Sequence, residues 1–226
     1  MASSGYLAAL FILLSVIITQ ARVPLQKRQT GNANDYIDKV LENARKHFRE
    51  NNMDPLPLPE AFEGFSKKIL FVTLSGDVKA WDGFVQGLSR LNRAGDITLR
   101  YEGGTIFLSG SLGIDKLSAG YTARARLGKL APTIKVQAWI AYISVSLGVQ
   151  IPSDGSPGYV NHLDIHNIGK IDIKIDGLIP LNYLLTAISF VFLNIFKNVL
   201  KKAFIPPITN AINGALRQID MPFGFL

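Results

Sequence analysis

The chain has no cysteine, and its 226 residues include only three histidines and two tryptophans. Without cysteine no disulfide can form, so the fold must be held together by burial of apolar surface. Thiolate metal sites and cysteine nucleophiles are excluded for the same reason. The sequence also has no Gly-x-Ser-x-Gly elbow, no phosphate-binding glycine loop and no Asn-x-Ser/Thr glycosylation sequon. We therefore expect a protein that is not an enzyme and that carries no cofactor.

Charged residues are also scarce. They make up 18% of the chain, whereas hydrophobic residues make up 48%. The apolar excess must lie in a core or in a ligand site. Lys and Arg exceed Asp and Glu by 24 to 17, a net charge of +7, which permits attraction to anionic lipid headgroups. The basic residues are not gathered in blocks, so we expect no nucleic-acid partner.

The first residues predict a targeting segment. Residues 1–21 contain no charged side chain, and an apolar run occupies residues 7–18. Such a run, followed by small residues, is typical of a signal peptide. We therefore divide the chain into a signal peptide (1–21), a flexible mature N-terminus (22–33) and a single domain (34–226). On this division the protein is secreted and extracellular.

The longest apolar stretch, residues 181–202, predicts a helix that is apolar almost all the way round in its first two-thirds. Such a helix must be enclosed by the rest of the protein. The stretch falls short of the roughly 20 apolar residues that span a bilayer. A re-entrant membrane segment and an amphipathic surface helix are the alternatives. Its main face is formed by Leu181, Leu184, Leu185, Ile188, Phe192, Ile195, Phe196 and Val199, and its opposite face begins with Tyr183, Ala187 and Phe190.

Residues 65–175 are rich in strand patterns. Residues 116–127 alternate between apolar and polar side chains, which predicts a half-buried antiparallel strand. Residues 134–151 also alternate, but the apolar side chains change from even to odd positions along the stretch. A shift of one residue reverses every side chain, so we predict a bulge near residues 139–142 that bends the sheet.

Helical patterns flank this β-rich region. Residues 34–51 predict an amphipathic helix. Residues 53–59 have three prolines at alternate positions, which predicts an extended spacer outside the sheet. Pro206 and Pro207 are expected to end the long helix before a short final helix at 208–219. The predicted fold is α+β: a strongly curved antiparallel β-sheet wrapped around a long C-terminal helix, with an N-terminal amphipathic helix and a short final helix.

A candidate metal site lies in residues 160–166. On a strand, His162, Asp164 and His166 share one face, and two imidazoles with a carboxylate could ligate zinc. The alternative is a polar, water-facing strand side opposite Leu163 and Ile165. We favour the water-facing strand and predict no metal site.

Several stretches resemble group 7 mite allergens and their arthropod relatives. The resemblance lies in residues 87–96, 125–132 and 160–185. The broader superfamily includes juvenile-hormone-binding and takeout proteins and the bactericidal/permeability-increasing type of lipid-binding domain. Residues 53–59 look like the entry segment of takeout-type proteins, which carry an N-terminal disulfide that this chain cannot form. That departure favours the group 7 branch.

The resemblance implies an apolar groove or tunnel between sheet and helix that accepts lipid-like molecules. Residues 34–226 are then a lipid-binding-like domain of a secreted carrier, and its partner is a hydrophobic small molecule or lipid. The alternatives are a basic protein that acts on an anionic membrane surface or bacterial lipid without a ligand, and a protein whose groove is filled by side chains. We expect a monomer or weak dimer. The expected ligand-binding residues are Tyr183, Ala187, Phe190, Phe192 and Phe196.

Overall fold

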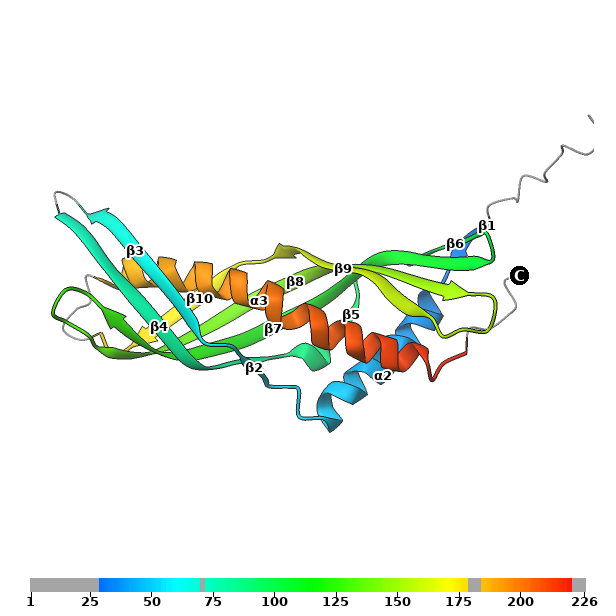
Figure 1. Ribbon diagram of the computed structural model, residues 1–226, viewed down its shortest axis with the longest axis horizontal. Helices are drawn as coiled ribbons and strands as arrows, with labels where there is room; N and C mark the ends of the chain where they lie inside the picture. Colours follow the sequence, from blue (N-terminus) through cyan, green and yellow to red (C-terminus); the bar gives the residue numbers. More distant parts are fainter. Residues whose placement is uncertain (1–28, 70–71, 179–183, 221–226) are drawn as a thin grey trace, which may run out of the picture.

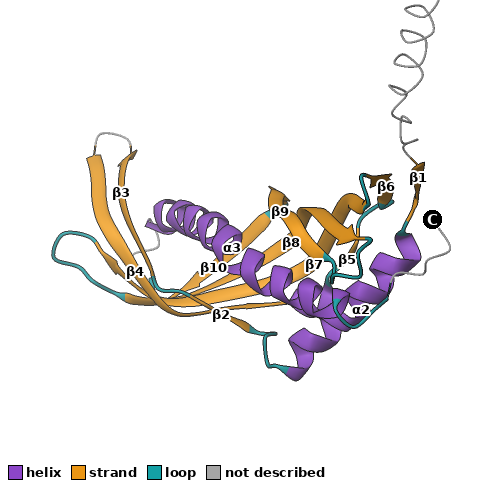
Figure 2. Ribbon diagram, turned by 45° about the vertical axis from the view of Figure 1, so that its right-hand side comes forward, coloured by secondary structure: helices purple, strands orange, loops and turns teal. Residues whose placement is uncertain are grey.

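Helix α3 (Leu185–Leu216) runs along the inner side of a curved β-sheet and sets the elongated shape of the molecule (Figure 1). The computed structural model describes residues 29–69, 72–178 and 184–220. Within these residues ten strands form one sheet, and their pairings are antiparallel. A second helix, α2 (Asn34–Glu50), packs against the C-terminal half of α3 (Figure 2). The α+β class and the curved antiparallel sheet around a long C-terminal helix are confirmed.

Two long strands, β7 (Thr105–Arg126) and β8 (Thr133–Pro152), run through the whole sheet. We call one end of the sheet the β10 half. There β3 (Ala61–Ile69) pairs with β4 (Val72–Gln86), β4 pairs with β7, and β10 (Ile171–Asp176) pairs with β8. β3 and β10 are therefore the opposite edges of this half, and α3 contacts both.

The other end is the β9 half, where β9 (Tyr159–Ile168) pairs with β8 and contacts α3. On the far side of β7 lie the shorter elements: β6 (Thr98–Glu102), β1 (Gln29–Asn32), β5 (Asn92–Arg93), η1 (Leu88–Arg90) and β2 (Leu56–Leu58), the last of which pairs with β4. The sheet therefore curves around α3 and leaves one side of the helix uncovered.

In both long strands the buried side chains switch from one face of the strand to the other, and the two switches lie opposite each other in the sheet. In β8 the buried side chains change from even to odd numbers at the exposed pair Ala141 and Tyr142, where the sequence predicted a reversal. β7 reverses at Asp115 and Lys116, and Lys116 has a φ of 54°. The pairing continues one to one across this level, from Asp115 opposite Tyr142 to Leu117 opposite Ile140. The predicted reversal is confirmed, although it is shared by two strands rather than being a one-sided bulge.

The same level also separates β9 from β10. The Gly169 N–H donates to the Tyr142 carbonyl at 2.8 Å, and the Ala141 N–H donates to the Lys170 carbonyl at 3.0 Å. We call this line across the sheet the crease. The crease runs across β7, across β8 and between β9 and β10. Because the strands change their buried face there together, the apolar side chains of both halves of the sheet face the helices.

The core lies between the inner side of the sheet and the two helices. The predicted apolar stripe of α2 is completely buried, and so are Phe192, Phe196 and Phe204 of α3. These side chains form one hydrophobic cluster with the inward residues of the strands. The buried stripe of α2 consists of Ile37, Val40, Leu41, Ala44 and Phe48.

The prediction that Pro206 and Pro207 end the long helix is wrong. α3 continues through both prolines to Leu216, so no separate final helix forms. A proline inside a helix costs about 3 kcal/mol. Burial of Ile208 and Ile212 on the next turns offsets this cost, since a buried Ile contributes about 1.5–3 kcal/mol.

Two segments that were expected to lie outside the sheet form strands. Leu56–Leu58 forms β2, which pairs with the end of β4, because an edge strand tolerates the missing N–H of Pro57. Gln29–Asn32, expected in the flexible N-terminus, forms β1. Its backbone supplies hydrogen-bonding groups to β6 whatever its side-chain pattern.

The predicted signal peptide lies outside the described residues. Within the described part of the chain, neither helix has an apolar stretch that is long enough to span a bilayer.

Candidate functional site

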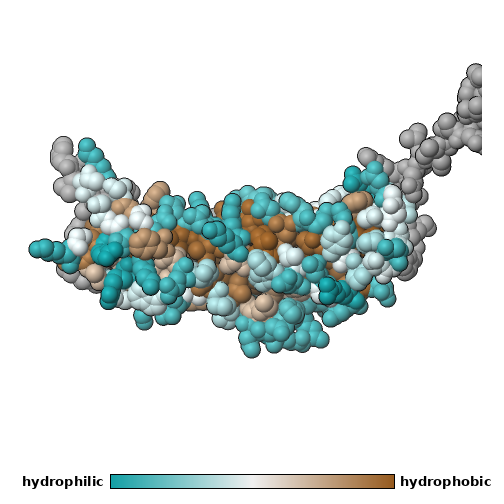
Figure 3. Space-filling view, viewed as in Figure 1, coloured by the Kyte–Doolittle hydropathy of each residue, from teal (hydrophilic) through white to brown (hydrophobic). Residues whose placement is uncertain are grey.

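A groove of about 390 Å³ lies between the edge strand β3 and the N-terminal half of α3. Its volume is within the range of ligand pockets in proteins. In Figure 3 hydrophobic surface follows the middle of the molecule along α3. The groove is lined by Glu63, Gly64, Phe65, Ser66, Ala187, Phe190, Val191 and Asn194.

Strand alternation and helix periodicity explain these walls. In β3 the half-buried Glu63 and Phe65 alternate with exposed residues, as expected for an edge strand with one face toward a helix. On α3, Ala187 and Val191 are one turn apart and each is 2% exposed, so they form the inner wall. Phe190 is 56% exposed and forms the rim. The small side chain of Ala187 leaves room between strand and helix.

The polar lining residues occur on both sides of the groove. Glu63 and Ser66 come from β3, and Asn194 comes from α3. A carboxylate accepts hydrogen bonds, whereas an amide both donates and accepts them. The groove can therefore hold an apolar chain against Phe65 and Val191 and orient a polar group at its rim.

The β3 side of the groove is braced by Tyr121 of β7. The Tyr121 hydroxyl donates a hydrogen bond to the Pro59 carbonyl at 2.8 Å, two residues before β3 begins. Its ring centroid is 5.7 Å from that of Phe196 on α3. Burial raises the pKa of Tyr121 to about 12, so the hydroxyl stays protonated and keeps this bond at physiological pH. Tyr121 thus links the strand that forms one wall to the helix that forms the other.

The structure brings together two of the five predicted ligand-binding residues. Ala187 and Phe190 line the groove. Phe192 and Phe196 are completely buried, with ring centroids 6.2 Å apart, and belong to the core beneath it. Tyr183 lies outside the described residues. The lining from β3 was not predicted, because the pattern of one strand does not say which helix it faces.

The candidate metal ligands lie on β9 with exposed side chains. The register shifts on either side of this stretch, and His166 Nδ1 lies 3.1 Å from the Ser146 hydroxyl. In the chain as far as the structure describes it, no three His, Asp or Glu side chains are close enough to hold a metal ion. The geometry of His162, Asp164 and His166 is that of a water-facing strand side.

Comparison with known proteins gives one family match and several relatives. A family model described as "Group 7 allergen" matches residues 32–216. "Mite allergen Lep d 7" from Lepidoglyphus destructor is 24% identical over 171 residues, which are 75% of this chain and 77% of the relative. "Mite allergen Der p 7" from Dermatophagoides pteronyssinus is 23% identical over 176 residues, which are 74% of this chain and 81% of the relative.

Two solved structures are also similar. A lipopolysaccharide binding protein has a TM-score of 0.42 and 17% identity, and the match covers 84% of this chain but only 38% of that protein. Takeout 1 from Epiphyas postvittana has a TM-score of 0.33 and 17% identity, with 83% of this chain and 90% of that one covered.

Proposed function

Because the chain belongs to the group 7 allergen family and has an apolar groove between β3 and α3, we propose that it is a secreted, non-enzymatic carrier of a hydrophobic, lipid-like ligand. On this proposal residues 34–226 act as one lipid-binding domain. The observation that carries the proposal is that Ala187 and Val191 of α3 line one wall of the groove and Phe65 of β3 lines the other. These side chains offer a ligand apolar contact on two sides.

The polar lining restricts the class of ligand. The Glu63 carboxylate would repel the carboxylate of a fatty acid, but it would accept a hydrogen bond from a hydroxyl group. The Asn194 amide can donate to a carbonyl or ester oxygen. Among lipid-like molecules, the groove therefore favours those with a neutral polar end.

The size of the groove limits the affinity. Burial of about 300 Å² of apolar ligand surface contributes about 7–8 kcal/mol at about 25 cal/mol per Å². Loss of ligand freedom reduces this value. A dissociation constant of about 1 μM corresponds to about 8 kcal/mol, so we expect micromolar or weaker binding.

Native mass spectrometry of the protein from a eukaryotic secretion host, followed by organic extraction, tests the proposal. A co-purifying lipid at near-unit stoichiometry is the expected result. Displacement of a fluorescent fatty-alcohol probe by a fatty alcohol and by a fatty acid of equal chain length then compares the two headgroups. The alcohol should compete better. A ligand-free mass together with no uptake of the probe would overturn the carrier proposal.

The alternative is a protein that acts on an anionic lipid surface without a ligand. The net charge of +7 favours it. It predicts salt-sensitive binding to vesicles by a protein from which no lipid can be extracted.

A further inference from the structure

The outer side of the β10 half, which faces away from α3, carries exposed aromatic and basic side chains. Phe62 of β3 lies opposite Lys79 of β4, which in turn lies opposite Arg124 of β7. Trp81 lies two residues after Lys79 on the same face of β4, and Arg126 lies two residues after Arg124 on the same face of β7. A hollow of about 450 Å³ is lined by Phe62, Asp77, Lys79, Trp81, Arg124 and Arg126, which we call the basic–aromatic face.

The exposure of Phe62 is not explained by packing in the described structure. Phe62 is 66% exposed, the largest value among the exposed large hydrophobic residues. Phe62 and Trp81 are diagonal neighbours across the β3–β4 pair, with Lys79 between them in register. The exposed Phe62 and the half-buried Trp81 together offer apolar area and an indole N–H that can bond to a polar interface.

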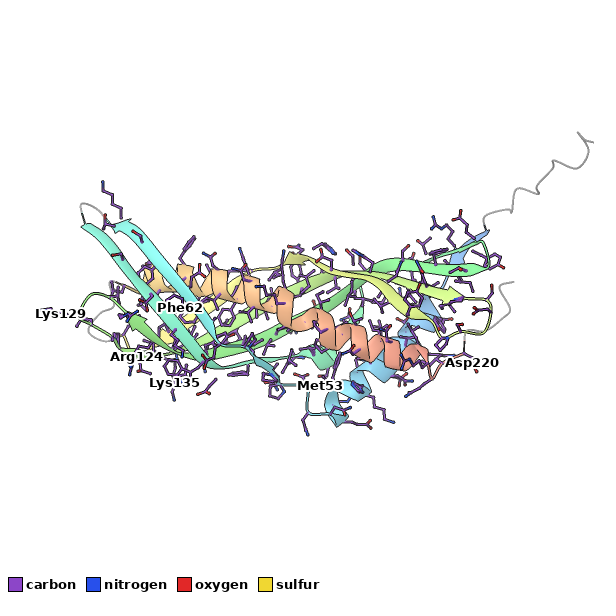
Figure 4. All side chains as sticks on the ribbon, viewed as in Figure 1. Met53, Phe62, Arg124, Lys129, Lys135 and Asp220 are labelled. Carbon is purple, nitrogen blue, oxygen red and sulfur yellow. The ribbon has the colours of Figure 1, made fainter. Side chains whose placement is uncertain are left out.

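The charges on this face favour an anionic partner. Lys79 and Arg124 stand directly opposite each other, and like charges in that position repel. Arg126 pairs with Asp77 at 2.8 Å, and Lys79 pairs with Glu60 at 3.3 Å through two exposed side chains. Arg124 has no acidic partner among the described residues. Figure 4 shows Arg124 and Phe62 at the same end of the molecule as Lys135 and Lys129.

We propose that the basic–aromatic face docks the protein on an anionic lipid bilayer. Arg124 and Lys79 contact lipid phosphates, and Phe62 and Trp81 enter the headgroup region, where aromatic side chains are enriched in membrane proteins. An extended bilayer fits because the face is an open sheet surface that presents cations and aromatics side by side. The attraction adds electrostatic and apolar contributions, as in other proteins that bind membrane surfaces.

The position of the face relative to the groove gives this docking a consequence. Phe62 and Phe65 lie on opposite sides of the same strand, so β3 is the wall between the basic–aromatic face and the groove. When the protein is docked on a bilayer through this face, only strand β3 separates the groove from the bilayer. Docking does not depend on the carrier function, because the two surfaces share no lining residue.

Vesicle co-sedimentation tests the docking. The protein should bind vesicles of phosphatidylcholine with phosphatidylglycerol, but not vesicles of phosphatidylcholine alone, and high salt should release it. Arg124→Gln should weaken binding about fivefold, since a basic residue near an anionic surface contributes on the order of a factor of five. The matched control is Arg49→Gln, which removes an exposed arginine of α2 outside this face and should leave binding unchanged.

The two tryptophans report the orientation. The Trp139→Phe variant leaves Trp81 in the face, and the Trp81→Phe variant leaves Trp139, which is opposite Ser118 on β7, whereas Trp81 is opposite Thr122. Trp139 is 48% exposed and lies on the same outer side of the sheet, but its position is about 13 Å farther along the strand, away from Lys79 and Arg124. On anionic vesicles the emission of Trp81 should shift to the blue more than that of Trp139.

Three results would overturn the proposal. They are equal binding to neutral vesicles, equal loss of binding in Arg124→Gln and Arg49→Gln, and a larger spectral shift for Trp139 than for Trp81. Binding to soluble polyphosphate that matches vesicle binding in salt dependence, with no shift of Trp81 emission on vesicles, would also overturn it and indicate a polyanion site. A protein that docks but takes up no probe would contradict only the carrier function.

Discussion

The side-chain oxygen of Asn213 accepts a hydrogen bond from the Val160 N–H, with 2.8 Å between the two atoms. Asn213 lies near the end of α3, beyond Pro206 and Pro207, and Val160 lies at the start of β9. The bond ties the last turns of the helix to the sheet. It exists because α3 continues through the prolines.

Removal of this bond should destabilise the protein. Asn213→Ala leaves the partly buried Val160 N–H without its partner, which costs about 1–3 kcal/mol. Asn213→Asp keeps an acceptor and should cost less. Urea unfolding measures the change, and Asn198→Ala, at an exposed position of the same helix, is the control. Equal effects of Asn213→Ala and Asn198→Ala on the free energy of unfolding would mean that the bond does not stabilise the protein in solution.

Replacement of an α3 proline should stabilise the protein. Pro206 is exposed, and Pro206→Ala restores a backbone N–H inside a continuous helix. The gain is reduced because alanine leaves the unfolded chain more freedom. We expect a net increase of about 1–2 kcal/mol in the free energy of unfolding, measured by urea denaturation. Asn210→Ala, also exposed on α3, should change it by less than about 0.5 kcal/mol. A destabilised Pro206→Ala protein would indicate that the helix breaks here.

The close approach of β4 to Tyr121 predicts a strong effect at Gly83. A Cβ atom at Gly83 would lie 2.2 Å from the Tyr121 ring, so Gly83→Ala must displace the ring from the Pro59 carbonyl and from Phe196. Overpacking of this kind costs about 1–3 kcal/mol, and the thermal unfolding midpoint should fall. At Gly64 of β3 the nearest atom to an added Cβ is 3.9 Å away, so Gly64→Ala is the matched control. Equal midpoints for the two variants would refute the assigned role of Tyr121.

Asp54 predicts a dependence of stability on acid. Its carboxylate accepts hydrogen bonds from the Gly87 N–H at 2.6 Å and the Ser89 N–H at 2.9 Å, and from the Ser89 hydroxyl. Burial raises the pKa of Asp54, but the bonds from Ser89 and Gly87 outweigh burial and hold the pKa below its usual value of 3.8. The folded state therefore gains stability above the pKa of the unfolded chain and loses it as the pH falls through the lower folded pKa.

Asp54→Asn should lower the free energy of unfolding at pH 7 by about 1–2 kcal/mol. The difference from wild type should shrink as the pH falls below about 4. Urea unfolding across this range measures it. Asp164→Asn, an exposed change on β9, should show no such trend. A difference that stays constant from pH 7 to acid would mean that the charge of Asp54 does not contribute.

The groove predicts a ligand effect at Phe190. Phe190→Ala removes the rim while the inner wall of Ala187 and Val191 remains. Affinity for a fluorescent fatty-alcohol probe should fall about fivefold, which corresponds to about 1 kcal/mol of lost apolar contact. Because Phe190 is 56% exposed, the thermal midpoint should change little. Phe84→Ala removes an exposed phenylalanine from β4, outside the groove, and serves as the control. Probe affinity that is equal in the two variants would place the ligand elsewhere.

Much of the fold could be predicted because apolar periodicity is local. The stripe of α2 from Ile37 to Phe48 and the change of phase in β8 are visible in the sequence, and both are confirmed. Helix continuation through Pro206 was not predictable by local rules. The local cost of the prolines is outweighed by burial of Ile208 and Ile212 against strands and helices that are distant in sequence.

The candidate site could be predicted only in part for a similar reason. The lack of a polar face on the first half of α3 indicated Ala187 and Phe190. The same apolar composition also suggested Phe192 and Phe196, which are core, because composition does not separate a wall that faces a cavity from one that faces packed side chains. Glu63 and Phe65 reach the groove through the pairing of β3 with β4, which is a tertiary property.

The crease also restricts how the length of this chain can vary. Deletion of one residue from β7 alone would turn its side chains outward on one side of the deletion, while β8 would keep its phase. A change in length within these strands is therefore tolerated only when a matching change occurs opposite it, near Asp115 and Tyr142. The hairpin tips at Gly103, Gly128 and Gly155 are free of this restriction. We expect insertions and deletions among natural variants of this protein to occur at the tips and to be rare along the crease.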